Sequence, residues 1–259
     1  MKNIFYILVA FISFATGIVT AQEETTKPEK EQQWSGNVSL SMVFNDGNTN
    51  SKTQRVATEI KKETGFGSVT VYGEYNEGSS EGNTNVRNSL GGIKVAKDIN
   101  ENSYVFMSFE TYKNQFKRLD RRNIGNLGYG QKLINNDSTK FNIEAGVSYT
   151  YENFELGSSE KYWGLRFADD FTHDLDNGVQ IFQKGEYIPS VESSRKYTIT
   201  SEQGFRSKLT ETLSIDTSVK LVYDNTIPKD FFGNPIPRDN GHDVRRLDAI
   251  YYVSLNKTF

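Results

Sequence analysis

The chain has 259 residues, a formal net charge of −3 and no cysteine, and 36% of its residues are hydrophobic. The lack of cysteine excludes disulfides, thiol catalysis and cysteine-based metal sites. No basic patch is evident, so a nucleic-acid partner is not expected. With a mean hydropathy of −0.61, a membrane protein this polar is expected to cross the bilayer with alternating strands.

The first residues predict export. Lys2 precedes an apolar run from Ile4 to Val19, and a small-residue cleavage site follows at Val19-Thr20-Ala21. We expect residues 1–21 to be a signal peptide, although a membrane anchor is the alternative; polar residues inside the run disfavour it.

Residues 22–33 contain almost no apolar side chains. Such a composition cannot bury a core, so this segment is predicted to be a disordered periplasmic spacer.

At Trp34 the pattern changes to period-two alternation, which is typical of a strand with one apolar and one polar face. The apolar positions of this first strand are Trp34, Gly36, Val38, Leu40, Met42 and Phe44. Eleven further segments alternate in the same way: 54–61, 69–75, 86–97, 104–112, 122–133, 141–151, 163–167, 179–187, 197–205, 213–223 and 247–259. In the fourth strand the parity slips at Gly91-Gly92, where a β-bulge is expected.

The connections between these strands sort into two kinds. Those near Gly65, Asn100, Asn136, Asp176 and Glu211 are short, and those near Gly47, Ser80, Lys117, Glu155, Ser193 and Asn234 are mostly longer. Bacterial barrels have short periplasmic turns and longer extracellular loops.

These patterns predict an all-β fold for residues 34–259: a transmembrane antiparallel up-and-down β-barrel of about 12 strands in the outer membrane of a Gram-negative bacterium. Outer-membrane lipid is then one expected partner. The other is the barrel-assembly machinery, which would act on the last strand, ending at Phe259. Fourteen Tyr and seventeen Phe suit aromatic girdles at both membrane interfaces, but they also suit a soluble all-β protein.

Several short motifs resemble a known family. They are Trp34-Ser35-Gly36, Gly47-Asn48-Thr49-Asn50-Ser51, Leu119-Asp120-Arg121-Arg122, and Gly125 with Gly128-Tyr129-Gly130. With the aromatic last strand, the chain is similar over about 34–259 to the salt-induced outer membrane proteins, a domain family of unknown function. The resemblance implies an outer-membrane barrel and supplies no catalytic residues.

Charged residues of both signs occupy the positions expected to face the lumen. The candidates are Arg55, Glu59, Glu74, Arg87, Glu110, Glu144, Arg166, Asp170, Lys184, Glu186, Glu202, Arg206, Asp216 and Lys220. They could line a selective channel, or they could fill the lumen with cross-strand ion pairs. A twelve-stranded lumen is wide enough for either arrangement. The main functional hypothesis is a narrow pore or an envelope-stabilising barrel.

An enzyme is the second hypothesis, because a barrel lipid hydrolase needs a Ser, a His and an orienting group. The two histidines are His173 in a predicted periplasmic turn and His242 in the last extracellular loop, near Asp239 and Asp243. No Gly-x-Ser-x-Gly elbow accompanies either, so no catalytic residue, cofactor or metal site is assigned.

Two loops leave other functions open. Residues 46–50 and 239–243 are oxygen-rich enough for loosely bound Ca²⁺, but they lack the spaced ligands of a dedicated site and are better interpreted as turns. The longest loop, 226–242, contains Phe231-Phe232 and three prolines, which suggests either a lumen plug or a contact surface. A surface binding protein that acts through its extracellular loops is therefore the third hypothesis.

Overall fold

In a computed structural model that describes residues 34–45, 51–155, 159–226 and 246–259, the chain forms a closed barrel. The described strands are β1 (Trp34–Asn45), β2 (Ser51–Thr64), β3 (Gly67–Ser80), β4 (Asn83–Asn100), β5 (Ser103–Asn114), β6 (Leu119–Asn135), β7 (Thr139–Phe154), β8 (Ser159–Asp174), β9 (Val179–Pro189), β10 (Tyr197–Lys208), β11 (Leu213–Asp224) and β12 (Leu247–Thr258). Two 3₁₀ turns, η1 (Gln115–Lys117) and η2 (Asp176–Gly178), join strands. Among the described residues, no helix is long and apolar enough to cross a membrane.

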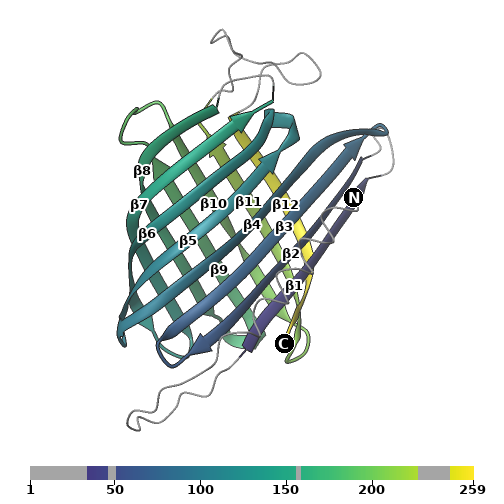
Figure 1. The fold of residues 1–259 in the computed structure, drawn as a ribbon. Coiled ribbons are helices and arrows are strands. Elements are labelled where there is room, and N and C mark those ends of the chain that lie inside the picture. The colour runs from purple at the N-terminus through teal and green to yellow at the C-terminus, as the bar shows by residue number, and fades with distance from the viewer. Residues whose placement is uncertain (1–33, 46–50, 156–158, 227–245) are drawn as a thin grey trace, which may run out of the picture. The chain divides into compact units, whose positions relative to one another are not determined.

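Each strand pairs antiparallel with the next one along the chain, and the ring closes where β1 meets β12 (Figure 1). The closing register runs from Asn37 opposite Thr258 to Ser41 opposite Ser254. Gly36 and Phe259 extend it by two backbone hydrogen bonds of 3.0 Å. The predicted twelve-stranded up-and-down barrel, closed by its last strand, is therefore confirmed.

Alternation places apolar side chains on the outer face and small polar ones inside. Leu40, Val147 and Leu255 are 46–49% exposed. The adjacent Ser41, Ser148 and Ser254 are only 1–3% exposed. A soluble sandwich would have the opposite arrangement, because its apolar face forms the core. The outer face is therefore suited to contact hydrocarbon.

Outer-face aromatic side chains gather near both ends of the strands. Toward one end, the ring of Tyr149 lies 5.0 Å from that of Trp163, and that of Tyr197 lies 5.7 Å from that of Tyr223. Toward the other end, Phe141 and Phe171 have ring centroids 6.1 Å apart. Two aromatic zones at the ends of an apolar band are typical of membrane barrels.

The two ends of the barrel differ in their connections. The turn end carries the short connections 65–66, 101–102, 136–138, 175–178 and 209–212, and the opposite end, the loop end, carries 81–82, 115–118 and 190–196. The other three connections include residues outside the described ranges. Of the described loop-end connections, only 190–196 is longer than every turn-end connection; 115–118 has four residues, as 175–178 and 209–212 do. The predicted sorting therefore holds only in part, and its clearest exception is between β3 and β4, where a longer loop was expected. Here the strands continue into a two-residue hairpin, because Glu81 and Gly82 both adopt positive φ, as such tight turns require.

The bulge predicted at Gly91-Gly92 is wrong. The register of β4 with β3 runs without a shift from Gly78–Val86 to Gly67–Lys97, so the parity of β4 never changes. Gly92 instead makes room for an aromatic ring on the neighbouring strand, since a Cβ at this position would lie 2.4 Å from Tyr72 Cζ.

The same arrangement recurs where β5 meets β6. Phe106 and Tyr104 lie opposite Gly128 and Gly130, and a Cβ at either glycine would come within 3 Å of the ring. These inward-facing rings lie against the barrel wall because the glycines leave it bare.

We expect Gly128→Ala to destabilise the barrel by about 1–3 kcal/mol, because its Cβ would lie 2.5 Å from the carbonyl oxygen of Ala145 as well as against Phe106. Gly125→Ala on the same strand is the control, since nothing lies within 4 Å of its Cβ position. Urea unfolding in detergent micelles measures the free energy of unfolding of both variants. Equal values for the two would contradict this packing.

Candidate functional site

The strand register places the predicted lumen candidates on the inward face, with one exception. Glu74 lies between Ala57 and Leu90 on the inward side, for example, and Glu202 lies opposite Lys184. Arg87 is the exception: it shares the outward parity of Ile93 on β4 and forms an ion pair with Glu77 at 3.5 Å. The expected bulge would have turned the side chains before Gly91 to the opposite face of β4. Because β4 has no bulge there, Arg87 points outward and does not belong to the lumen wall.

A buried ion-pair layer, which we call the upper layer, lies near the loop end. Arg122 on β6 donates to Glu152 on β7 at 2.5 Å and to Asp224 on β11 at 2.6 Å. Tyr162 also donates to Glu152, at 3.1 Å. The side chains of Arg122, Glu152 and Asp224 are 5%, 0% and 5% exposed, so the lumen is filled where they meet.

The η1 turn adds a second contact near the loop end. Asn114 accepts hydrogen bonds from the backbone N–H groups of Phe116 and Lys117, which fixes the turn. The Lys117 side chain is thereby buried, and its Nζ lies 2.9 Å from Asp248 Oδ2 on β12. This contact joins the β5–β6 connection to a strand on another part of the ring.

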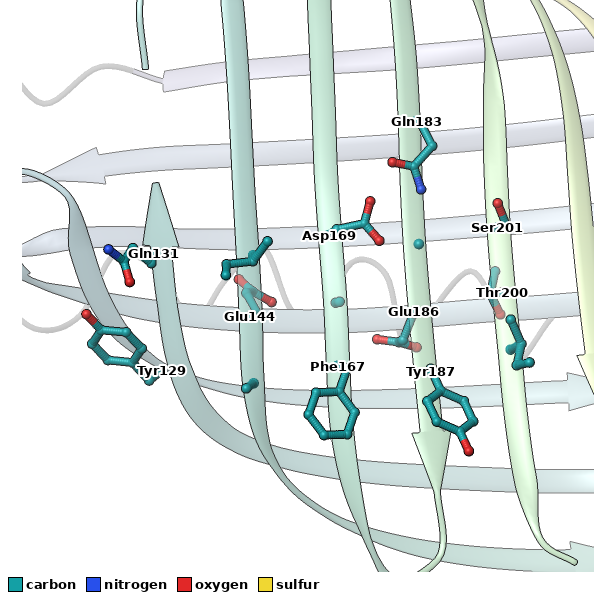
Figure 2. Close-up of a pocket in the computed structure, with 15 residues that line it drawn as sticks. Tyr129, Gln131, Glu144, Phe167, Asp169, Gln183, Glu186, Tyr187, Thr200 and Ser201 are labelled. Carbon is teal, nitrogen blue, oxygen red and sulfur yellow. The ribbon is translucent and has the colours of Figure 1, made fainter. Parts of the chain in front are cut away.

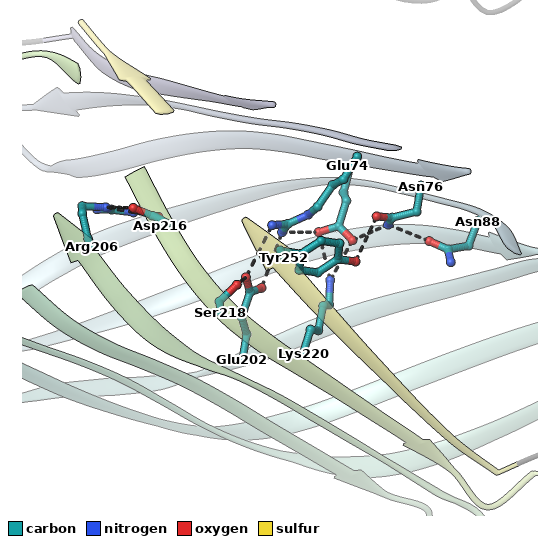
Figure 3. A network of polar contacts seen from close by, with 10 residues as sticks. Glu74, Asn76, Asn88, Glu202, Arg206, Asp216, Ser218, Lys220 and Tyr252 are labelled. Atoms are coloured by element: carbon teal, nitrogen blue, oxygen red, sulfur yellow. Dashed lines mark hydrogen bonds and ion pairs between the residues drawn. The ribbon is translucent and has the colours of Figure 1, made fainter. Parts of the chain in front are cut away.

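A middle layer follows toward the turn end (Figure 3). Glu74 on β3 accepts from Arg55 on β2 at 2.7 Å and from Lys220 on β11 at 2.9 Å. Arg55 also reaches Glu202 on β10 at 3.5 Å, and its guanidinium lies 4.4 Å from the centre of the Tyr252 ring. Two cations and two carboxylates meet here, so this set is electrically balanced.

The middle layer has a second part, on β4 to β9. Glu144 accepts from Arg166 at 2.7 Å and from Tyr104 at 2.6 Å, and it also pairs with Lys94. Arg166 bonds Glu186 at 2.6 Å. These contacts link inward side chains of β4, β5, β7, β8 and β9 into one connected group.

Charged groups toward the turn end are more open. Lys184 lies 3.8 Å from both Glu59 and Asp170, and the three side chains are 56%, 42% and 46% exposed. Arg206 and Asp216 form a further pair at 2.9 Å. The exposed fraction of the paired side chains therefore rises from the upper layer toward the turn end.

Several ion pairs join strands that are not neighbours in the ring, and we call three of them, between strands far apart around it, the cross-lumen ion pairs. They are Arg122–Asp224 between β6 and β11, Glu74–Lys220 between β3 and β11, and Arg55–Glu202 between β2 and β10. Because these strands stand on different sides of a closed ring, each pair reaches across the interior. Such pairs tie opposite walls together and occupy the space that a solute would need.

Several members of these layers were not predicted. They are Lys94, Arg122, Glu152, Asp224 and Asp248. Lys94 points to the same inward face of β4 as Gly92. It could have been predicted as a lumen residue if no bulge had been expected. Arg122, Glu152, Asp224 and Asp248 lie close to strand ends, where alternation alone does not show whether a residue still belongs to the wall.

The other sequence candidates contribute little to this site. His173 lies near the turn end of β8 and hydrogen bonds to Thr139 Oγ1 at 2.8 Å. His242, the candidate calcium loops 46–50 and 239–243, and nearly all of the long loop 226–242 lie outside the described residues. Within the described ranges, no group of three or more His, Asp or Glu side chains could hold a metal ion.

Comparison with protein families identifies a match. The model of a family described as "Protein of unknown function, DUF481" matches residues 38–232, more than half of the chain. The chain belongs to this family. The expected resemblance is thereby confirmed as far as a domain of unknown function, and the salt-induced description stays a prediction. No curated protein matches the DUF481 chain.

Solved structures similar to the DUF481 chain include an anion-selective porin from Comamonas acidovorans, with 10% identity over 88% of this chain and 99% of that one and a TM-score of 0.41. Another is described as the KdgM porin, with 11% identity, coverage of 87% and 99%, and a TM-score of 0.45. The translocator domain of the autotransporter NalP from Neisseria meningitidis has 8% identity, coverage of 100% and 95%, and a TM-score of 0.44.

Proposed function

We propose that this chain is an outer-membrane barrel whose lumen is closed at rest by its cross-lumen ion pairs. It would act as an envelope-stabilising barrel rather than as a permanently open pore. The observation that carries this proposal is the upper layer, in which Arg122 bonds carboxylates on β7 and β11 with almost no exposed surface.

The membrane placement follows from the outer face. Its apolar side chains would contact the hydrocarbon core, and its two aromatic zones would lie at the two membrane interfaces. A closed barrel also pairs its backbone N–H and C=O groups between strands, as the bilayer requires. The turn end then faces the periplasm and the loop end faces the outside. Residues 1–21 would direct export, 22–33 would precede the barrel as a spacer, and β12 would be the strand that the assembly machinery engages.

Closure by ion pairs is favoured by the energetics of the upper layer. Buried charges must be fully paired to be tolerated, and breaking such a pair by removing one partner costs about 3–5 kcal/mol. A solute passing this level would have to separate Arg122 from Glu152 and Asp224. The resting barrel therefore presents a large barrier to small ions and solutes.

Swelling of liposomes tests this function. Liposomes that contain the wild-type barrel are expected to swell in an isosmotic pentose solution no faster than empty liposomes, since the closed lumen excludes the sugar. Insertion is verified in the same sample by the shift in gel mobility on heating that folded barrels show. Rapid swelling by the wild-type protein would overturn the closed-lumen proposal and favour a constitutive pore.

A further inference from the structure

The outer face of the barrel has a recess between β6 and β10, mainly apolar but with several polar side chains in its lining. It has a volume of about 630 Å³, and its lining includes Gln131, Asp169, Gln183 and Ser201 (Figure 2). These four residues have the outward parity of their strands, opposite to that of Glu144 and Glu186. Polar side chains here interrupt a surface that is otherwise mainly apolar.

The recess arises from side-chain size. One row of cross-strand neighbours contains the aromatic residues Tyr129, Phe167 and Tyr187. The next row toward the turn end contains Asp169, Gly185 and Ser201. Small side chains beside large rings leave a hollow with one aromatic wall and a polar floor.

Two polar groups converge over the floor of this recess. A Cβ at Gly185 would lie 2.3 Å from Asp169 Oδ1 and 3.0 Å from Gln183 Nε2. Unlike the lumen carboxylates, Asp169 forms no ion pair or hydrogen bond with any residue in the described ranges. An ionisable side chain on a lipid-facing surface is costly, and this predicts a partner from outside the chain.

A second copy of this chain is a poor partner. A two-fold contact centred on the recess would bring two Asp169 carboxylates together, and like charges repel. Outward-facing lysines that could pair with Asp169 in another geometry, such as Lys62, Lys97 and Lys257, lie near strand ends rather than at its level.

We propose that the recess binds a phospholipid whose headgroup carries a primary ammonium. The ammonium donates to Asp169, the Gln183 amide donates to a phosphate or ester oxygen, and an acyl chain lies along Phe167 and Tyr187. Asp169 lies nearer to the turn end of β8 than to its loop end, so a headgroup of the periplasmic leaflet is the one within reach. The inference needs the outer face to meet lipid but not the lumen to be closed.

Native mass spectrometry tests the site. Full-length barrel is extracted from vesicles of equal parts phosphatidylethanolamine and phosphatidylglycerol, and the lipids retained by the folded protein are counted. The wild-type barrel is expected to retain phosphatidylethanolamine preferentially. Asp169→Asn removes the charge that holds the ammonium, so the preference should fall about tenfold.

Two further variants separate this site from general lipid contact. Ser201→Leu fills the recess and leaves Asp169 in place, so it should also abolish the preference. Ala249→Leu adds the same side chain on the outer face of β12, outside the recess, and should leave the preference unchanged. An equal effect of both leucines would contradict a specific site.

Each remaining outcome decides the proposal. A barrel that inserts but retains both lipids equally overturns the lipid site and leaves the proposed function untouched. A dimer that disappears in Asp169→Asn would replace the lipid with a second copy. Failure of the chain to insert into vesicles would overturn both this inference and the proposed function.

Discussion

A barrel in which both Arg55 and Arg122 are replaced with alanine is expected to conduct ions. Each guanidinium takes part in a cross-lumen ion pair, Arg55 with Glu202 and Arg122 with Asp224. Truncation of both side chains opens the middle and upper layers together. Carboxylates then outnumber cations along the opened lumen, so the conductance should favour cations.

Current across planar bilayers measures this result, with ion preference taken from the reversal potential in a salt gradient. The control is Arg87→Ala with Lys113→Ala, which removes two positive charges from the outer face of β4 and β5. The control should remain silent. If the doubly substituted lumen variant folds, inserts and stays as silent as the control, the cross-lumen pairs do not close the barrel.

A companion variant guards against misfolding of the lumen variant. It adds Glu152→Gln and Asp224→Asn, so that no buried carboxylate of the upper layer is left without its cation. This companion is also expected to conduct, because Gln and Asn are no larger than Glu and Asp and the missing Arg122 side chain still leaves the upper layer open.

Arg122→Ala alone is expected to lower the free energy of unfolding by about 3–5 kcal/mol. It leaves Glu152 and Asp224, both almost fully buried, without the guanidinium that bridges them. Two uncompensated carboxylates in one enclosed space are destabilising because burial removes their hydration. Urea-dependent unfolding in lipid vesicles, followed by tryptophan fluorescence, gives the change.

Lys113→Ala provides the matched control for this prediction. Lys113 pairs with Asp120 at 2.9 Å, but both side chains are well exposed. An exposed ion pair contributes about 0–1 kcal/mol, so the control should be close to wild type. Similar small losses for both variants would show that the upper layer does not hold the barrel together.

Much of the wall could be predicted from alternation. Leu40 and Val147 on the outside and Glu74 and Glu144 on the inside all follow from parity, because successive side chains of a strand point to opposite faces. Alternation predicts the wrong face for the first part of β4, because its two adjacent glycines resemble a bulge. Their actual role depends on Tyr72 of the neighbouring strand, and a single-strand pattern contains no information about such a contact.

Partners across the lumen could not be predicted. Whether Arg122 meets Asp224 depends on how far the strands tilt and shift when the ring closes, which no local pattern specifies. The recess around Asp169 had a visible signal, since a carboxylate stands between Phe167 and Phe171 on an apolar face. The hollow itself required Gly185 and Ser201 to align beside Asp169, and their alignment is a property of the register.

The most direct test of the closed lumen is a recording of the wild-type barrel in a planar bilayer. Many inserted copies are held at a constant voltage, first in 0.1 M and then in 1 M salt, beside the Arg55→Ala/Arg122→Ala variant. Closure by buried ion pairs predicts no steady unitary current from the wild type in either salt, since burial shields these pairs from screening. Steady unitary steps from the wild-type protein would contradict it.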